Sequence, residues 1–361
     1  METLSDKLLD KAVAGDRLSE EEGLYLLRHA ALPDLGASAH AVRNLRHGPK
    51  VSYVVDRNIN YTNVCVSGCR FCAFYKDRAE QGAYVLDDKA FFQKIEETFA
   101  MGGRQILLQG GMHPDLDIRW QESLLRKLKV HFPRLHVHGY SPPEIAYYAD
   151  KEGISDKECI QRLVKAGLDS IPGGGAEILV DRVRLEASPR KCLTDRWLSV
   201  MKDAHETGLR TTATMMFGHL ETDAEIIEHM ERLRRLQDET QGFTAFIPWT
   251  FQPLHTRMEG KSATAVEYLK VLALSRLYLD NIDNIQASWV TQGDKIAQTA
   301  LFFGANDMGS TMIEENVVAA AGVSYRLPLT TIQRLIRDAG FEAVERDCFY
   351  RYAECNSHET I

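Results

Sequence analysis

Three cysteines stand close together in the first part of the chain, at Cys65, Cys69 and Cys72. Their spacing is too tight for a disulfide framework and lacks the paired C-x-x-C halves of a zinc ribbon. Thiolates this close together can bind one metal ion or one iron–sulfur cluster. Three thiolates leave one iron of a [4Fe-4S] cluster without a protein ligand, so that this iron can bind a substrate. Gly68 lets the loop turn tightly, because glycine tolerates backbone angles that other residues resist.

Short apolar or β-branched runs alternate with helical stretches from residue 51 onward. This alternation predicts a parallel sheet in an α/β protein, and eight strands would close a TIM-type (β/α)8 barrel. The last run gives the weakest signal, so a partial barrel of six strands is the alternative. The predicted strands cover 51–60, 105–109, 135–140, 170–172, 210–217, 244–250, 284–290 and 302–307. The predicted helices between them cover 87–101, 120–132, 156–166, 194–207, 223–237 and 263–279.

Segments with a different pattern flank the predicted barrel. Ser19 and Glu22 form a capping box before a leucine-rich stretch, which predicts helices near the start of the chain. We interpret these helices as packing elements rather than as a lid. A helix at 330–338 and a β-like tail at 341–352 are predicted near the other end. The predicted parts are an N-terminal helical segment at 1–50, the barrel at 51–322, and a C-terminal helix and β tail packed on the barrel at 323–361.

The composition is that of an ordinary globular protein, with 361 residues, 44% hydrophobic and 26% charged. A net charge of −8 argues against a nucleic-acid partner. No apolar run approaches the roughly 18 residues of a membrane span, and residues 1–10 lack the apolar core of a signal peptide. The seven cysteines are odd in number and partly clustered, which favours a reducing compartment, and we expect the cytoplasm. We assign no role to the scattered Cys159, Cys192, Cys348 and Cys355.

The stretch from Cys65 to Cys72 resembles the C-x3-C-x-aromatic-C signature of the radical S-adenosylmethionine (radical SAM) superfamily, with Phe71 as the aromatic residue. The resemblance implies that Cys65, Cys69 and Cys72 bind a [4Fe-4S] cluster. It also implies that the open iron takes the amino and carboxylate groups of SAM. An electron from the reduced cluster would then cleave SAM to methionine and a 5′-deoxyadenosyl radical.

Over nearly its whole length the chain resembles a family of radical SAM enzymes from the futalosine route to menaquinone and from deazaflavin synthesis. Stretches 248–253 and 287–289 resemble the cyclases of this family in particular. For a cyclase, the resemblance implies dehypoxanthine futalosine as substrate, hydrogen abstraction from ribose C4′, addition of the carbon radical to the benzoate ring, and loss of one electron and one proton. It also implies an electron donor such as flavodoxin or ferredoxin. The alternatives are an aminofutalosine synthase, a deazaflavin-chromophore synthase, or a non-catalytic electron carrier, although a carrier would normally supply four cysteines.

Contacts to SAM are expected where strands end, because barrel enzymes bind ligands at the carboxyl edge of the sheet. In the superfamily, a glycine-rich motif after the second strand binds the amino group of SAM, and here Gly110 and Gly111 take that place; a plain turn is the alternative. Glu177 follows three glycines and can accept hydrogen bonds from the ribose or the amino group, or it can be a helix-start charge. The predicted cofactor-binding residues are Phe71, Gln109, Gly110, Gly111, Ser141, Glu177 and Arg182.

Substrate contacts are expected near the later strand ends. Aromatic side chains there can hold a flat ring, and a Gly-Ser-Thr turn can present amides to a carboxylate or simply cap a helix. The implied reaction also needs a group that accepts a proton. The predicted substrate-binding residues are Trp249, Phe251, Gln252, Ser310 and Thr311, and the predicted catalytic residues are His219, Glu144 and Glu314.

Overall fold

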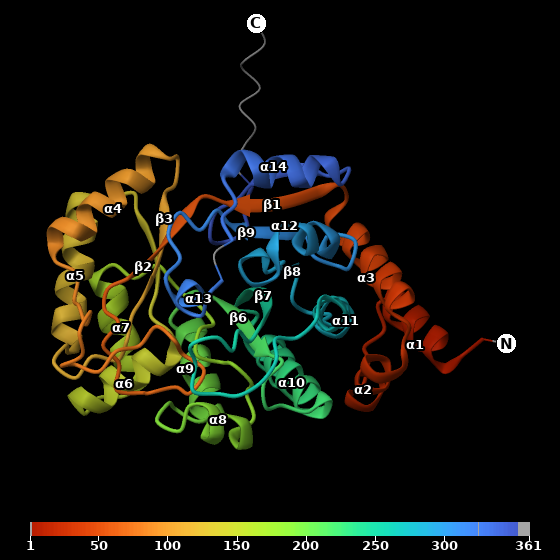
Figure 1. Ribbon diagram of the computed structural model, residues 1–361, viewed down its shortest axis with the longest axis horizontal. Coiled ribbons are helices and arrows are strands. Elements are labelled where there is room, and N and C mark those ends of the chain that lie inside the picture. Colours follow the sequence, from red (N-terminus) through yellow and green to blue (C-terminus); the bar gives the residue numbers. More distant parts are fainter. Residues whose placement is uncertain (1, 324, 353–361) are drawn as a thin grey trace, which may run out of the picture.

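The computed structural model of the chain describes residues 2–323 and 325–352. Its larger sheet has seven parallel strands that follow one another in chain order (Figure 1). Helices connect successive strands and cover the outer face of this sheet. The strands are β2 (Asp56–Asn60), β3 (Gln105–Gln109), β4 (His136–Gly139), β5 (Ser170–Ile171), β6 (Arg210–Phe217), β7 (Phe243–Thr250) and β8 (Asn284–Ile285).

A second sheet brings the first and last strands of the barrel together. It has the order β10 (Glu342–Glu345), β1 (Lys50–Val54), β9 (Asp307–Ser310), and both pairings are parallel. A bridge between Gln286 and Asp307 links the end of β8 to β9, and β1 continues into β2 after Val55. The strands therefore run around a central axis, which confirms the predicted α/β barrel class.

The helices follow from capped, amphipathic segments. Asp87, Ser155 and Thr222 each accept a hydrogen bond from a backbone N–H in the first turn of the helix that follows. Apolar side chains then recur on the face that packs against the sheet. The helices of the barrel are α4 (Asp88–Ala100), α5 (Ile118–His131), α6 (Pro142–Glu152), α7 (Asp156–Ala166), α8 (Asp181–Ala187), α9 (Thr194–Glu206), α10 (Asp223–Thr240), α11 (Ala265–Tyr278) and α12 (Trp289–Ala300).

Two predicted strands near the end of the barrel had wrong bounds. The strand predicted at 284–290 stops at Ile285, because the chain turns into α12 at Trp289. The strand predicted at 302–307 is instead β9, which begins at Asp307. Residues 301–303 continue as turns after α12, where Leu301 N–H donates to Gln298 at 3.2 Å and Phe303 N–H donates to Ala300 at 2.9 Å.

The C-terminal part contains α13 (Val317–Ala320), α14 (Leu329–Asp338) and β10, close to the predicted helix and β tail. Because β10 pairs with β1, this part belongs to the same sheet as the first barrel strand. Residues 353–361 of the predicted C-terminal part (323–361), including Cys355, lie outside the described residues. The division of the chain into three separate parts stays a prediction. Within the described residues, no helix combines the length and apolar character that crossing a bilayer requires.

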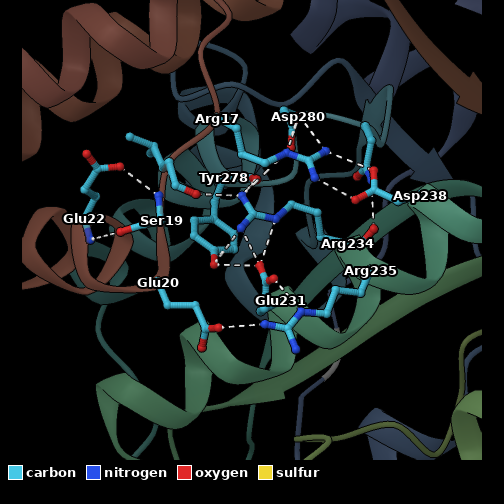
Figure 2. Close-up of polar contacts among 12 residues, drawn as sticks. Arg17, Ser19, Glu20, Glu22, Glu231, Arg234, Arg235, Asp238, Tyr278 and Asp280 are labelled. Carbon is cyan, nitrogen blue, oxygen red and sulfur yellow. Dashed lines mark hydrogen bonds and ion pairs between the residues drawn. The ribbon is translucent and has the colours of Figure 1, made fainter.

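Helices α1 (Leu4–Val13), α2 (Glu20–His29) and α3 (Leu32–His47) lie beside α10 and α11, on the side away from α4 and α5 (Figure 1). Polar contacts fix them there (Figure 2). Arg234 of α10 is only 4% exposed, donates to Leu18 O at 2.9 Å, and stacks on the Tyr278 ring with Cζ 4.0 Å from its centre. Arg17 pairs with Asp238 at 2.6 Å. These contacts agree with the interpretation of the first helices as packing elements.

We expect Arg234→Ala to lower the free energy of unfolding by about 3 kcal/mol, because removing one partner leaves the others buried and unpaired. The neighbouring Arg235 pairs with Glu20 at 3.0 Å, but its side chain is 66% exposed. Arg235→Ala should therefore change the free energy of unfolding by less than about 1 kcal/mol. Urea denaturation of both variants checks this difference, and equal losses would contradict it.

Candidate active site

A cavity of about 280 Å³ occupies the interior of the barrel, which we call the lumen. Successive side chains of a strand point to opposite faces, so alternate residues face the lumen. The lining side chains of β2 and β3 are Asp56, Asn58, Gln105, Leu107 and Gln109. Residues from later strands and loops complete the lining, among them His138, Gly174, Glu177, Trp249, Gln286, Trp289, Ser310 and Glu315.

The three cysteines share the loop between β2 and α4. Ser67 joins two of them, since its Oγ lies 2.9 Å from Cys65 Sγ and 3.3 Å from Cys69 Sγ. Burial raises the pKa of the Cys69 thiol to about 11 and also raises that of Cys72, and a neighbouring thiol adds to each shift. No three His, Cys, Asp or Glu side chains of the described residues are arranged for a single metal ion. A [4Fe-4S] cluster differs, because each thiolate binds a different iron and the sulfurs lie farther apart.

Lys191 lies beside this cysteine loop. Its Nζ is 2.9 Å from Glu177 Oε1 and 5.0 Å from the centre of the Phe71 ring. Burial opposes the charge of Lys191, but the Cys69 thiol and the Glu177 carboxylate outweigh burial and raise its pKa. A cation beside thiols favours the thiolate form, which is the form that binds iron. The buried thiols and the adjacent ammonium group therefore fit the cluster that the sequence predicts.

Glu177 presents one unused oxygen. Its Oε2 is buried without a hydrogen-bond partner, and Arg184 Nη1 lies 3.7 Å away. The residue lines the lumen and has φ +42°, a left-handed conformation that is costly for glutamate and persists only where its surroundings hold it. A buried acceptor without a donor is available to a ligand. The contact of Glu177 with SAM stays a prediction, and this geometry leaves Oε2 free for it.

Gly110 and Gly111 are packed too closely for a side chain. A Cβ on Gly110 would lie 2.5 Å from the Tyr61 ring, and a Cβ on Gly111 would lie 2.1 Å from the Val64 carbonyl oxygen. The N–H of Gly110 donates to Glu144 Oε1 at 3.1 Å, and that of Gly111 donates to a backbone carbonyl before the cysteine loop at 3.0 Å. Within the described residues neither carbonyl oxygen accepts a hydrogen bond, so both oxygens are free to accept one from a ligand.

Glu144 connects the ends of three strands. Its carboxylate accepts hydrogen bonds from Tyr61 Oη at 2.8 Å, from the Gly110 N–H at 3.1 Å, and from the N–H and Oγ of Ser141, both at 2.7 Å. Burial raises the pKa of Glu144, although these donors act in the opposite direction. Neither Ser141 nor Glu144 lines the lumen. The structure thus gives both residues internal bonds at the start of α6, and the contact of Ser141 with SAM and the proton transfer by Glu144 stay predictions.

Three further predicted site residues also lie outside the lumen lining. The guanidinium of Arg182 binds both oxygens of Glu225, at 2.7 and 2.6 Å, on the exterior of the barrel. The ring of His219 has Nε2 2.9 Å from a backbone carbonyl of β6. Glu314 accepts a hydrogen bond from Lys94 Nζ at 2.5 Å. The structure therefore does not bring Arg182, His219 and Glu314 together with the residues that face the lumen.

The predicted aromatic contacts divide between the lumen and a neighbouring apolar cluster. Trp249 lines the lumen and also packs, as Phe71 does, against the cluster that contains Phe251. Phe251 is only 1% exposed, so its ring is part of the packing beneath the cysteine loop. Gln252 donates to the backbone carbonyl of Thr250 at 3.2 Å and to its Oγ1 at 3.0 Å. Of these residues, Trp249 alone faces the cavity.

At the predicted carboxylate site of Ser310 and Thr311, three backbone amides are already hydrogen-bonded. The N–H groups of Gly309, Thr311 and Met312 already donate within the protein, at 2.8, 2.9 and 2.7 Å. Ser310 lines the lumen, and its hydroxyl donates to the Asp56 carboxylate. Ser310 is therefore placed to touch a ligand, whereas these three backbone amides are already paired, and the carboxylate contact of the turn stays a prediction.

Several lining residues were missed from the sequence. Asp56 and Asn58 are two positions apart in the first predicted strand and therefore face the same side of the sheet. The two-residue period of a strand could have identified them as lining residues. Arg346 and Tyr350 come from the C-terminal segment and lie at the base of the lumen, where the Arg346 guanidinium binds Asp307 at 2.6 and 2.9 Å. No local pattern in that segment indicated a position inside the barrel.

Comparison with protein families gives two matches that together span most of the chain. Residues 59–233 match the radical SAM superfamily, and residues 240–359 match the CofH/MqnC C-terminal region. Among solved structures, methylornithine synthase superposes with a TM-score of 0.70 at 19% identity, over 93% of this chain and 97% of that chain. This similarity supports the fold.

Curated relatives are similar over most of their length. A cyclic dehypoxanthine futalosine synthase of Halalkalibacterium halodurans is 45% identical, over 96% of this chain and 94% of the relative. The synthase of the same name from Streptomyces coelicolor is 44% identical, over 96% and 88%. A 5-amino-6-(D-ribitylamino)uracil–L-tyrosine 4-hydroxyphenyl transferase of Methanothermobacter thermautotrophicus is 40% identical, over 98% and 99%.

The barrel and the cysteine loop thus define a radical SAM enzyme. Within that superfamily, the chain belongs to the family that contains the cyclic dehypoxanthine futalosine synthases, which confirms the resemblance found in the sequence. Radical SAM enzymes use SAM and a [4Fe-4S] cluster, so membership implies both cofactors.

We expect Glu144→Gln to lower the free energy of unfolding by about 2 kcal/mol, because the new NH₂ group would face donors rather than acceptors. Glu152 at the end of α6 provides the control, since its side chain makes no hydrogen bond within the described residues. Glu152→Gln should change the free energy of unfolding by less than about 0.5 kcal/mol. Urea unfolding followed by circular dichroism measures both values, and a Glu144→Gln variant as stable as the wild type would contradict the assigned role.

Proposed function

We propose that this protein catalyses the oxidative cyclisation of dehypoxanthine futalosine to cyclic dehypoxanthinylfutalosinate in menaquinone biosynthesis. The observation that carries the proposal is the identity of 45% and 44%, over 96% of the chain, to two cyclic dehypoxanthine futalosine synthases. The two cyclase-like stretches of the sequence add support, because Trp249 of the first and Ala287, Ser288 and Trp289 of the second line the lumen.

In this proposal Cys65, Cys69 and Cys72 hold the cluster, and Lys191 offsets the negative charge of their thiolates. The Oε2 atom of Glu177 and the free carbonyls after β3 hold SAM. When bound, the cluster and SAM together supply the 5′-deoxyadenosyl radical that removes hydrogen from the ribose C4′. The chain itself contributes binding and orientation, as is usual where the cofactor carries the chemistry.

The shape of the lumen supports an intramolecular cyclisation. Leu107, Ile247, Trp249 and Trp289 line it with apolar surface, against which an aromatic ring can pack. A ring held there lies within the same small cavity as the sugar to which it is attached. Positioning of this kind removes much of the entropic barrier to bond formation, and exclusion of water protects a carbon radical. For the proton acceptor, His219, Glu144 and Glu314 remain sequence-based predictions, which the lumen geometry does not favour.

The electron donor and the location belong to the same proposal. A small reductant such as flavodoxin or ferredoxin would supply the electron, since SAM cleavage consumes one. A cytoplasmic location is consistent with thiols that must stay reduced to bind iron.

The direct test is an anaerobic incubation of reconstituted protein with SAM, a strong reductant and dehypoxanthine futalosine, read by mass spectrometry. We expect 5′-deoxyadenosine and a product about two mass units lighter than the substrate, because the reaction removes two hydrogens. Deoxyadenosine without that product would redirect the assignment to another substrate of the family. A product that retains the adenosine would indicate an aminofutalosine synthase. If neither product forms although the cluster is intact, the proposal is wrong.

We expect Cys69→Ser to lose the iron and the visible absorbance of the reconstituted cluster, and to abolish formation of deoxyadenosine. The circular dichroism spectrum should be unchanged, because the serine fits the space of the thiol. Cys159 of α7 is the control, since it is buried in the main apolar core. Cys159→Ser should keep its cluster and its activity. Full turnover by Cys69→Ser would refute the assignment of this loop.

A further inference from the structure

Several polar side chains of the lumen are hydrogen-bonded within the protein. Asp56 accepts hydrogen bonds from Ser310 and, at 3.0 Å, from Gln105 Nε2. His138 Nδ1 lies 2.7 Å from the Ser170 hydroxyl, and Arg346 is bound by Asp307. These groups satisfy each other inside the protein, so they need no ligand to complete their hydrogen bonding.

Asn58 is different from these paired residues. It lies in the middle of β2, is 5% exposed and lines the lumen. Its Oδ1 is buried without a partner, and within the described residues its side-chain amide makes no hydrogen bond. Two positions further along the same strand, Asn60 is paired: its Nδ2 donates to Gln109 O at 3.4 Å, and its Oδ1 accepts from Asn316 Nδ2 at 3.3 Å.

A buried amide without partners destabilises the folded protein, because it gives up hydrogen bonds to water and gains none. Native proteins tolerate few such groups, and those that persist commonly meet a ligand or an ordered water. Asn58 therefore marks a point in the lumen where a bound molecule completes the hydrogen bonding.

The position of Asn58 points to the substrate rather than to SAM. In the sheet, Asn58 pairs with Leu107, whereas Asn60 pairs with Gln109, next to the glycines and the cysteine loop. Asn58 thus lies one layer deeper in the lumen than the residues proposed to hold SAM. Leu107 and His138 lie at that depth. The lining also contains Gln286, whose side chain makes no hydrogen bond within the described residues.

The chemistry of a primary amide limits the kinds of chemical group that Asn58 can bind. Asn58 offers one acceptor and two donors and carries no charge. A hydroxyl group both donates and accepts, so a sugar matches this pattern, whereas a carboxylate would leave Oδ1 unpaired. We propose that Asn58 is a substrate-binding residue whose side-chain amide forms hydrogen bonds with a ribose hydroxyl of the substrate. This inference rests on the proposed function, because it takes the ribose from the proposed substrate.

The test is Asn58→Leu, which keeps the approximate shape of the side chain and removes its polar atoms. Calorimetry of the reconstituted protein without reductant measures the binding of dehypoxanthine futalosine and of SAM separately. We expect the Kd for dehypoxanthine futalosine to rise at least about tenfold, which corresponds to about 1.4 kcal/mol. The Kd for SAM should stay within about twofold of the wild-type value, because SAM binds in the layer above.

Thermal stability separates a binding role of Asn58 from a structural one. A structural role predicts that Asn58→Leu lowers the Tm, whereas a binding role predicts an unchanged or higher Tm. The Tm of ligand-free Asn58→Leu should equal or exceed that of the wild type, because an unsatisfied amide has been replaced by an apolar group. Asn60→Leu is the matched control, since it breaks existing hydrogen bonds in the same strand and should lower the Tm. Analogues that each lack one ribose hydroxyl locate the contact: with one of them, wild type and Asn58→Leu should bind equally.

Several outcomes would overturn the inference. Unchanged affinity of Asn58→Leu for a substrate that the wild type binds would refute it and leave the proposed function intact. An equal loss of affinity for SAM would assign Asn58 to the cofactor site, and a lowered Tm would assign it a structural role. Failure of the wild type itself to bind dehypoxanthine futalosine would overturn the proposed function together with this inference.

Discussion

The buried carboxylate of Glu144 is the interaction on which the geometry of the site depends. It accepts hydrogen bonds from groups that follow three consecutive strands of the barrel: Tyr61 after β2, Gly110 after β3 and Ser141 after β4. A buried carboxylate is tolerated only where donors surround it, so these donors cannot shift independently of one another. The cysteine loop begins shortly after Tyr61 and packs against Gly111, so this carboxylate helps to fix the loop relative to the strand ends. Backbone contacts of the loop, such as Val66 N–H to Met112 O at 3.0 Å, add to this.

Local patterns in the sequence were sufficient for the cysteine motif and for most of the barrel. The strands at 105–109 and 210–217 and the helix at 156–166 coincide with β3, β6 and α7, because alternation and amphipathic spacing express how each segment packs. The end of the barrel could not be predicted in this way. Trp289 resembles a strand residue, yet it begins α12 and donates its indole N–H to Ser310 O at 3.0 Å, a contact made across the fold.

Site residues were predictable where backbone packing alone decides their identity, as at Gly110 and Gly111. They were not predictable where a distant partner decides which way a charged side chain points. Arg182 follows a glycine-rich loop, but Glu225, 43 residues away, binds its guanidinium on the outside of the barrel. Conversely, Lys191 lies in an unremarkable stretch of sequence and is brought to the cysteines by the fold.

Charge in the lumen limits how a substrate can lie there. Asp56, Glu177 and Glu315 line it, and the guanidinium of Arg346 is occupied by Asp307. Burial lowers the pKa of His138 to about 3, so this imidazole is neutral at physiological pH. The described lining thus offers an anionic group no uncommitted cation. An acidic substrate must therefore rely on neutral donors such as the amides of Gln109 and Gln286.

The C-terminal segment makes the two ends of the lumen different. Arg346, Cys348 and Tyr350 line the base of the lumen, and β10 pairs with β1 beside them. These side chains narrow the lumen at that end, so the cysteine loop borders its wider opening. If the substrate lies deeper than SAM, as proposed above, it must bind before SAM and leave after it, and the fold then gives the catalytic cycle an order.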